Sequence, residues 1–343
     1  MSMTPVTPSA PTAIDPSLRA AWRRFLNYSE VSTRQKKLYR YLRQMIIVVA
    51  FSASTLAVAS TFDLPKVVSD VLRLFLIILP LAGVAVMTYA TQFAAGTTWI
   101  EYRVSAERIR SNIYLFRLQA GNYHSKPIDE RRRLLLDSVE KADDRIETDK
   151  TVPYLQVLDD DISGRIDYET QHTNDNGISP ITIQDYINYR VKPQLRWYVN
   201  RIQKDYTQMK RWRLTSLGIA GLGSALAGIG GDLVTMVAVT TALGAGVTLW
   251  MELRLHGYTY SIYHWAAISI QERLNQWEIL SEERQADSEE QSKLVNDIEQ
   301  VFWEESKRWR DQAIQAQSSS EDQLFANLSL EGSVTEPNED DDL

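Results

Sequence analysis

Apolar residues in this chain are concentrated in four long segments without a charged residue. These segments are residues 45–61, 74–90, 214–229 and 233–251, each 16 to 19 residues long. An α-helix of about 17 residues is about 26 Å long, which approaches the roughly 30 Å hydrocarbon core of a bilayer once flanking residues contribute. Helices also satisfy every backbone hydrogen bond within one segment, as lipid requires. The pattern predicts an all-α integral membrane protein with four spans.

The four segments form two pairs, each joined by a short turn. Residues 62–65 (FDLP) follow the first segment of the first pair and residues 230–232 (GGD) separate the second pair, and both are turn signals. Because such short connections force neighbouring helices to run antiparallel, we expect two helical hairpins. Pro80 lies inside the second segment and predicts a kink, which lipid-embedded helices tolerate.

Two other interpretations of the apolar segments were weighed. A buried hairpin of a soluble protein is disfavoured, because four uncharged segments with charged or turn boundaries exceed what core helices show. Residues 57–59 (AVA) resemble a signal-peptide cleavage site. However, a region of more than forty residues with a helical pattern precedes them, unlike a signal sequence.

Basic residues precede each hairpin. Residues 34–43 contain five Lys and Arg, including Arg40 and Arg43, and residues 201–213 contain five more, including Arg211 and Arg213. The turns are poor in basic residues. Because cytoplasmic flanks of spans are enriched in Lys and Arg, we expect both termini and the central region to face the cytoplasm. These basic residues also make anionic lipid a candidate ligand.

The ends of the chain have biased compositions. Pro, Ser and Thr dominate residues 1–17, which favours a disordered leader. Residues 318–343 contain eight acidic residues and no Lys or Arg, so without them the formal net charge of −7 becomes +1. We expect a disordered acidic tail. The predicted organisation is a leader, a first repeat, a linker, a second repeat and a tail, at residues 1–17, 18–150, 151–180, 181–315 and 316–343.

The two halves of the chain share one design, in which a basic helix leads into a hairpin and a long helix leaves it. A shift of 169 residues places Asp63 on Asp232, and a shift of 161 places Tyr102 on Tyr263. Such internal duplications usually pack about a pseudo-two-fold axis. The sequence thus indicates a tandem repeat.

Two motifs carry a resemblance to a known family. Residues 186–198 read YINYRVKPQLRWY and residues 99–107 read WIEYRVSAE. Together with the hairpins they resemble the two-TM family called domain of unknown function 4231, over most of residues 20–312, and the second half matches better. That family is similar to the SLATT domains, two-TM modules predicted to be membrane effectors beside nucleotide-sensing proteins in prokaryotic conflict systems. The resemblance implies a prokaryotic plasma or internal membrane and transfers no catalytic residue.

No pattern in the sequence assembles a catalytic, cofactor or metal site. There is no cysteine, the four histidines lack ligand spacing, and no phosphate-binding loop occurs. The carboxylates at 143–144 and 159–161 are more typical of solvated turns than of a Ca²⁺ loop. Small residues at Gly218, Gly221 and Gly228 favour close helix packing. We therefore expect no enzyme activity, no cofactor and no metal.

The fourth segment contains one suggestive polar stripe. Thr241, Ala245, Thr248 and Glu252 are four, three and four residues apart, which places them on one helical face. Such a face could line a cation path. Alternatively, the threonines bond their own i−4 carbonyls and Glu252 extends to the membrane interface. Both interpretations stay open at this stage.

Large aromatic residues outside the spans predict a cytoplasmic helical bundle, part of which covers a subunit interface. These residues include Trp197, Tyr198, Trp277, Trp303 and Trp309. The expected partners are the lipid bilayer, further copies of the chain and a cytoplasmic protein, but not nucleic acid, because the basic clusters lie against the membrane. The hypotheses are an oligomeric pore-forming or ion-conducting effector, and a non-conducting scaffold or sensor that recruits a cytoplasmic partner.

Overall fold

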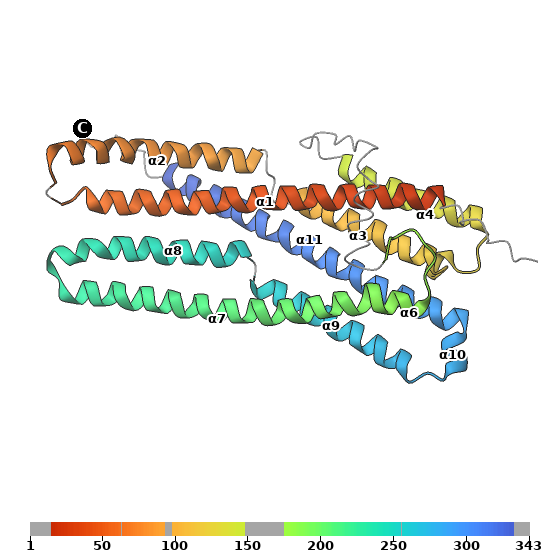
Figure 1. The fold of residues 1–343 in the computed structure, drawn as a ribbon. Helices are drawn as coiled ribbons and strands as arrows, with labels where there is room; N and C mark the ends of the chain where they lie inside the picture. The colour runs from red at the N-terminus through yellow and green to blue at the C-terminus, as the bar shows by residue number, and fades with distance from the viewer. Residues whose placement is uncertain (1–14, 63, 93–97, 148–174, 255, 333–343) are drawn as a thin grey trace, which may run out of the picture. The chain divides into compact units, whose positions relative to one another are not determined.

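The computed structural model describes residues 15–62, 64–92, 98–147, 175–254 and 256–332, and within these residues it is helical with no strand (Figure 1). The predicted all-α class is confirmed. The helices are α1 (Pro16–Ala59), α2 (Lys66–Gln92), α3 (Thr98–Arg117), η1 (Gly121–Tyr123), α4 (Ile128–Glu147), α6 (Ile183–Tyr186), η3 (Ile187–Val191), α7 (Lys192–Ile229), η4 (Gly231–Thr235), α8 (Met236–Arg254), α9 (His256–Glu278), α10 (Glu282–Ala286) and α11 (Ser288–Gly332).

Two of these helices have the length and composition of membrane spans. They are Pro16–Ala59 and Lys66–Tyr89, whereas the apolar helix Leu233–Thr248 is shorter. In their most apolar windows only 11% and 6% of the residues are buried, whereas the core helix of a soluble protein would be mostly buried. The first hairpin therefore fits a membrane. Among the described residues, the second hairpin contributes only the shorter apolar helix Leu233–Thr248.

The chain divides into two compact units, and long helices contribute to both. The first unit comprises residues 1–33, 102–204 and 263–305, and the second comprises residues 34–101, 205–262 and 306–343.

The first unit is a helical bundle with an aromatic core. Ile109, Ile113 and Phe116 of α3 recur at helical spacing and are buried, so one face of α3 lies against its neighbours. Trp22 and Phe25 of α1 pack in the same cluster with ring centroids 5.0 Å apart. This core fixes the backbone from which the polar groups described below project.

The second unit contains both hairpins, and each hairpin pairs its helices antiparallel (Figure 1). In the first hairpin Leu42 of α1 packs with Val86 of α2, and a Cβ on Gly83 would lie 3.2 Å from Val49. In the second hairpin the rings of Trp212 and Trp250 lie 6.3 Å apart across α7 and α8. The predicted hairpin topology is therefore present in both halves.

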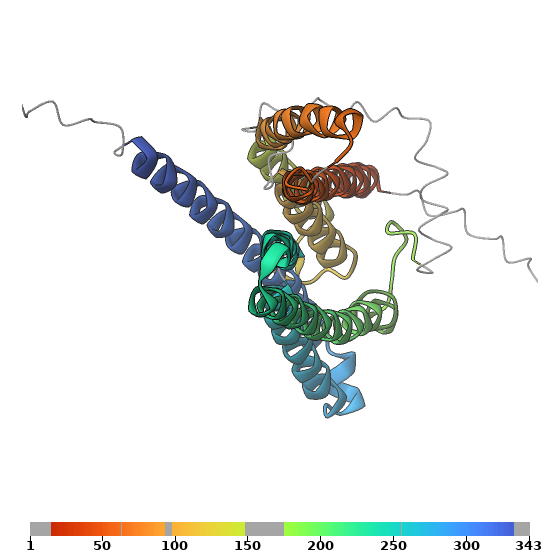
Figure 2. The same ribbon diagram turned by 90° about the vertical axis from the view of Figure 1, so that its left-hand side faces the viewer.

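The turns and ends of the helices differ in part from the prediction. Gly230 and Gly231 have φ of +75° and +66°, which glycine adopts without strain, and they close the second hairpin. Helix α11 continues unbroken to Gly332 (Figure 2), so residues 316–332 are helical where a disordered tail was predicted. The reason is compositional, since Ala, Gln and Leu favour helices and most of the acidic residues follow Gly332. Residues 1–14, 148–174 and 333–343 of the predicted leader, linker and tail lie outside the described residues.

Candidate functional site: a buried ion-pair network

A buried arginine forms the centre of the first unit. Arg190 is 2% exposed, and its Nε and Nη2 donate hydrogen bonds of 3.1 and 3.0 Å to the two carboxylate oxygens of Glu299. Nη2 also donates to Glu107 of α3. The guanidinium lies 4.3 Å from the ring centroid of Phe302 and 5.1 Å from that of Tyr114. One side chain thus connects three segments of the bundle through charge and aromatic faces.

Glu299 is fully satisfied by its neighbours. It is also 2% exposed, and besides the two bonds from Arg190 it accepts hydrogen bonds from Ser111 Oγ at 2.6 Å and from Tyr186 OH at 3.0 Å. A buried carboxylate is tolerated only when it is paired and hydrogen-bonded. The four donors come from α3, α6 and η3. These three elements together fix the position of α11.

The local sequence explains how Arg190 reaches this position. Thr182 and Asp185 form a capping box at the start of α6, in which each side chain bonds the backbone N–H of the other residue. Residues Ile187–Val191 form a π-helical turn. Pro193 is the second residue of the following helix α7, and because it has no N–H and its ring crowds the carbonyl of the residue four positions earlier, the helix widens at this turn. Arg190 therefore projects from a wide turn.

The charges of the network set the pKa values of its members. Burial opposes ionisation of Glu107, but the positive charges of Arg190 and Arg110 outweigh it and hold the pKa of Glu107 below its ordinary value. Burial likewise opposes the charge on Arg190, yet Glu107 and Glu299 keep its pKa well above the ordinary value. Burial, reinforced by the charge of Glu299, raises the pKa of Tyr186. At neutral pH the centre is an ionised arginine between two carboxylates.

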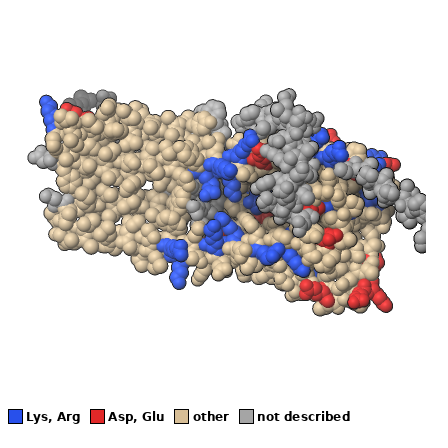
Figure 3. Space-filling view, viewed as in Figure 1, with Lys and Arg blue, Asp and Glu red and all other residues tan. Residues whose placement is uncertain are grey.

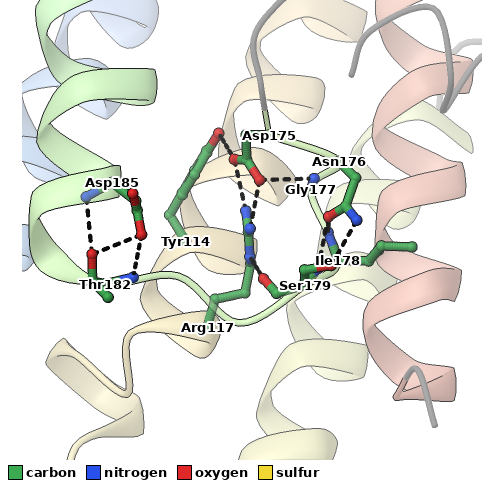
Figure 4. A network of polar contacts seen from close by, with 9 residues as sticks. All are labelled: Tyr114, Arg117, Asp175, Asn176, Gly177, Ile178, Ser179, Thr182 and Asp185. Carbon is green, nitrogen blue, oxygen red and sulfur yellow. Dashed lines mark hydrogen bonds and ion pairs between the residues drawn. The ribbon is translucent and has the colours of Figure 1, made fainter. Parts of the chain in front are cut away.

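A second buried carboxylate anchors the loop that precedes α6 (Figure 4). Asp175 accepts hydrogen bonds of 2.9 and 2.6 Å from the two Nη atoms of Arg117, and one of 2.9 Å from Tyr114 OH. Burial alone would raise the pKa of Asp175. The hydrogen bonds and the charge of Arg117 lower it by more than burial raises it, so the pKa lies below its ordinary value. Gly177 has φ +73°, and an added Cβ would lie 2.4 Å from the indole of Trp22. The loop is therefore held by both charge and close contact.

Other ion pairs of the first unit are more peripheral. Asp143 of α4 accepts a 2.7 Å contact from Arg24 and a hydrogen bond from Tyr28. Asp143 is thus paired rather than placed in a solvated turn, which corrects the prediction for residue 143, whereas residues 159–161 lie outside the described residues. Glu305 is 2% exposed and lies 3.5 Å from Arg103.

The arrangement is chemically saturated. Each buried carboxylate described above is paired with an arginine. Within the described residues, no three His, Asp or Glu side chains group as metal ligands. Such a network holds helices in register, because a buried charge tolerates few alternative positions.

The predicted polar stripe lies on the exposed side of α8. Thr241, Ala245 and Thr248 are exposed, and the two hydroxyls donate to the carbonyls of Val237 and Gly244 at 2.8 and 3.0 Å. The alternative raised for the threonines is therefore observed. Because a bonded hydroxyl oxygen keeps lone pairs as acceptors, the stripe can still face a cation. The side chain of Glu252 lies outside the described residues.

The three glycines predicted to pack do not do so within the chain. A Cβ on Gly218, Gly221 or Gly228 would meet nothing within 4 Å. The close approach is made instead by Gly223, whose Cβ would lie 2.7 Å from Thr240 Oγ1. At 100° per residue, the three predicted glycines lie roughly 140–220° around α7 from Gly223, on the face turned away from α8. Close packing of another helix on these three glycines stays a prediction.

The basic and aromatic residues lie partly where they were expected. Arg40, Arg43, Arg211 and Arg213 are exposed on the helices that lead into the hairpins. Figure 3 shows Lys and Arg where a broad uncharged surface of the hairpins ends. Among the predicted bundle aromatics, Tyr198 and Trp277 are buried and Trp303 and Trp309 are partly buried, whereas Trp197 is 43% exposed.

The sequence did not predict the network itself. Arg190 and Glu107 lie inside the two family motifs, but they were used there only as signature residues. The available signal was a charged residue on an apolar helix face. Tyr186 lies four residues before Arg190, and it is buried. Val295 and Phe302 lie four residues before and three after Glu299, and both are buried. Nothing local indicates that residues separated by 109 positions form a pair.

Comparison with family models finds two matches in tandem. Residues 23–130 match the model described as protein of unknown function (DUF4231), and residues 186–309 match the model described as SMODS and SLOG-associating 2TM effector domain 1. The resemblance to this pair of families is confirmed. The DUF4231 match falls on the first half, although the sequence motifs had favoured the second. No curated protein and no solved structure was found to match the chain.

Proposed function

We propose that this chain is a four-span membrane protein of a prokaryotic plasma or internal membrane that oligomerises into an ion-conducting or pore-forming effector. The observation that carries the proposal is that each of the two matched segments contains one apolar hairpin, and that one matched model describes a two-TM effector domain. Two such segments in tandem supply four spans. The proposal gives the chain no catalytic role, cofactor or metal.

The exposed apolar side chains support a lipid environment for both hairpins. In α2, Leu81 and Val84 are 66% and 65% exposed, and in α7, Leu217 and Ile229 are 70% and 69% exposed. In water, exposed surface of this kind would be costly, at roughly 25 cal/mol per Å². In a bilayer the same side chains contact acyl chains at no such cost.

The outward faces of the second hairpin support assembly. A Cβ on Gly218, Gly221 or Gly228 would meet nothing within 4 Å, so the backbone of α7 is open on this face, and small residues there allow another helix to approach closely. On α8 the hydroxyls of Thr241 and Thr248 lie on an exposed face. When copies of the chain surround an axis with this face inward, the hydroxyl oxygens and Glu252 line a polar path.

Topology is tested by cysteine labelling, because the chain has no native cysteine. Single substitutions Thr61→Cys and Val234→Cys mark the two turns, and Lys141→Cys and Ser281→Cys mark the first unit. In sealed cells a membrane-impermeant maleimide should label the turn positions only, and it should label the other two after permeabilisation. Equal labelling of all four positions in intact cells would reject four spans with cytoplasmic termini.

Conduction is tested by ion flux from liposomes containing the purified chain. Thr241→Val, Thr248→Val and Glu252→Gln should each change the flux at least tenfold. The matched control is Thr215→Val, because Thr215 is exposed on α7 and its hydroxyl also bonds its own i−4 carbonyl. Absence of flux with every ligand tried, together with silent Thr241 and Glu252 variants, would remove the conducting function.

A non-conducting scaffold or sensor is the second candidate. The observation in its favour is the exposed apolar surface of the first unit, where Trp197 and Val199 are 43% and 51% exposed and Ile268 is 46% exposed. Large exposed aromatic residues are typical of binding surfaces. A soluble partner that copurifies in fixed stoichiometry, is lost on Trp197→Ala, and still binds when the hairpins are replaced by unrelated spans would favour the scaffold.

A further inference from the structure

Each hairpin begins with a group of cations for which the surrounding helix offers no counter-charge. On α1 the group is Lys37, Arg40 and Arg43, and on α7 it is Lys210, Arg211 and Arg213. No acidic residue occurs between Glu30 and Asp63 or between Asp205 and Asp232, and Asp205 itself is 1% exposed. The two groups are called the basic collars below.

The collar side chains are exposed and lack acidic partners. All six residues are exposed, and none forms an ion pair with another residue of the described chain. The guanidinium of Arg43 lies 5.5 Å from the ring centroid of Tyr39, an aromatic contact that leaves its charge without an acidic partner. By contrast, the arginines at the centre of the first unit are paired with carboxylates. Three uncompensated like charges on one helix repel one another, which is unfavourable unless an anion lies beside them.

The distances along the helix match a lipid headgroup layer. Arg43 is two residues before the apolar segment at 45–61, and Lys37 is eight residues before it, which correspond to about 3 and 12 Å of rise. In the second hairpin Arg213 and Lys210 are one and four residues before the segment at 214–229, about 1.5 and 6 Å. The headgroup region extends several Å beyond the hydrocarbon core, and long basic side chains reach further into it.

Aromatic side chains occupy the same level. Tyr41 is 58% exposed beside the α1 collar, and Tyr206 is 54% exposed just before the α7 collar. Trp212, inside the α7 collar, packs on Trp250 of α8. Amphipathic aromatic rings are enriched at the level of lipid headgroups. The combination of unpaired cations and exposed tyrosines at one depth is the chemistry of an anionic phospholipid site.

We propose that the two basic collars bind the phosphate groups of anionic phospholipids, so that the protein selects such lipids from a mixed membrane. This inference rests on the proposed membrane insertion and is independent of conduction. The Arg side chains bond phosphate oxygens in a bidentate manner, and the Lys side chains act as point charges.

The test uses the full-length chain in nanodiscs of equal phosphatidylglycerol and phosphatidylcholine. After mild detergent extraction, native mass spectrometry measures the ratio of the two lipids that remain bound. The wild type should retain mainly phosphatidylglycerol. Removing each collar by a triple substitution to Gln should lower the ratio at least fivefold, which corresponds to about 1 kcal/mol. The two triples are Lys37→Gln, Arg40→Gln, Arg43→Gln and Lys210→Gln, Arg211→Gln, Arg213→Gln.

Matched variants separate a site from net charge. The control triple is Arg19→Gln, Arg133→Gln and Lys293→Gln, which removes three exposed cations of the first unit and should leave the ratio unchanged. Arg40→Lys with Arg43→Lys keeps the charge and should retain most of the selectivity. Raised salt should weaken the selectivity, because exposed charges are screened.

Several results would overturn the inference. The first is that the wild type retains the two lipids equally. The second is that the control triple lowers the lipid ratio as much as the collar triples do. The third is that added inorganic phosphate displaces all of the bound phosphatidylglycerol. If one of these results is found and the protein still floats with membranes, only the lipid site is rejected and the proposed membrane insertion is retained. If the protein does not float with membranes, membrane insertion and this inference fail together.

Discussion

Replacing Arg190 with Met tests whether the buried network is ionic or merely well packed. Methionine keeps much of the apolar stem of the side chain but removes the guanidinium, which lies over the ring of Phe302 and between Glu107 and Glu299. The Glu299 side chain is 1% exposed and cannot be hydrated, whereas Glu107 is 22% exposed and can contact water. In the variant Glu299 keeps its hydrogen bonds from Ser111 and Tyr186 but loses its buried counter-charge.

The magnitude follows from the lost counter-charge. Removal of one partner of a buried ion pair typically costs about 3–5 kcal/mol, because a buried charge is left uncompensated. In a unit of roughly 150–250 residues, such a loss lowers the unfolding temperature by about 6–20 °C.

The assay is thermal unfolding in detergent at neutral pH, followed by helical circular dichroism. Arg190→Met should destabilise by about 3–5 kcal/mol. Arg196→Met is the control, since Arg196 is exposed on the adjoining helix. Arg190→Met combined with Glu299→Met should recover most of the loss. A loss below about 1 kcal/mol, or no recovery in the double variant, would refute the ionic reasoning.

Three further predictions concern the first unit and its helix ends. Gly177→Ala should destabilise by more than 1 kcal/mol, because φ is +73° and the new Cβ would meet an indole ring, whereas Gly221→Ala should be neutral or stabilising in the same unfolding assay. Thr182→Ala should cost about 1 kcal/mol in that assay by removing the capping box, and an unchanged midpoint would contradict the cap. The pKa values of Glu107 and Asp175 are lowered on folding, so their stabilisation is complete above about pH 4–5, and denaturant titrations should show it lost as pH falls further. Asp175→Asn should flatten that pH dependence.

The hairpins were predictable because their signal is local. An uncharged segment of about 17 residues is recognisable as an apolar helix from its own composition. A three-residue turn such as 230–232 requires the two helices that it joins to run antiparallel. The helix boundaries agree to within a few residues, as with α7, which ends at Ile229 as predicted. Residues 316–332 were mispredicted because the acidity of the last eleven residues was extended to neighbours that favour helix.

The interior contacts were not predictable because their signal is long-range. The period of α7 places Gly218, Gly221 and Gly228 on one face and Gly223 on the other, but only the position of α8 decides which face is the packed one. Arg190 and Glu299 are likewise separated by 109 residues, and each alone could equally be a solvated surface charge. A single sequence shows which residues share a face of a helix, but it does not show which face is turned toward a neighbouring helix.

A buried ion pair is poorly explained by stability alone, since well-packed apolar residues of similar volume often stabilise as much. The geometry of this network explains it better. Arg190 has donors in a fixed planar fork, and Glu107, Glu299 and the rings of Phe302 and Tyr114 meet that fork together at a single register of the helices. Moving α11 by one turn, about 5.4 Å, would bury both carboxylate and guanidinium without partners. An apolar core tolerates such slippage more readily. We infer that the network selects one arrangement of the segments at residues 102–117 and 186–191 with α11, and so holds residues of the two family-matched segments in one unit.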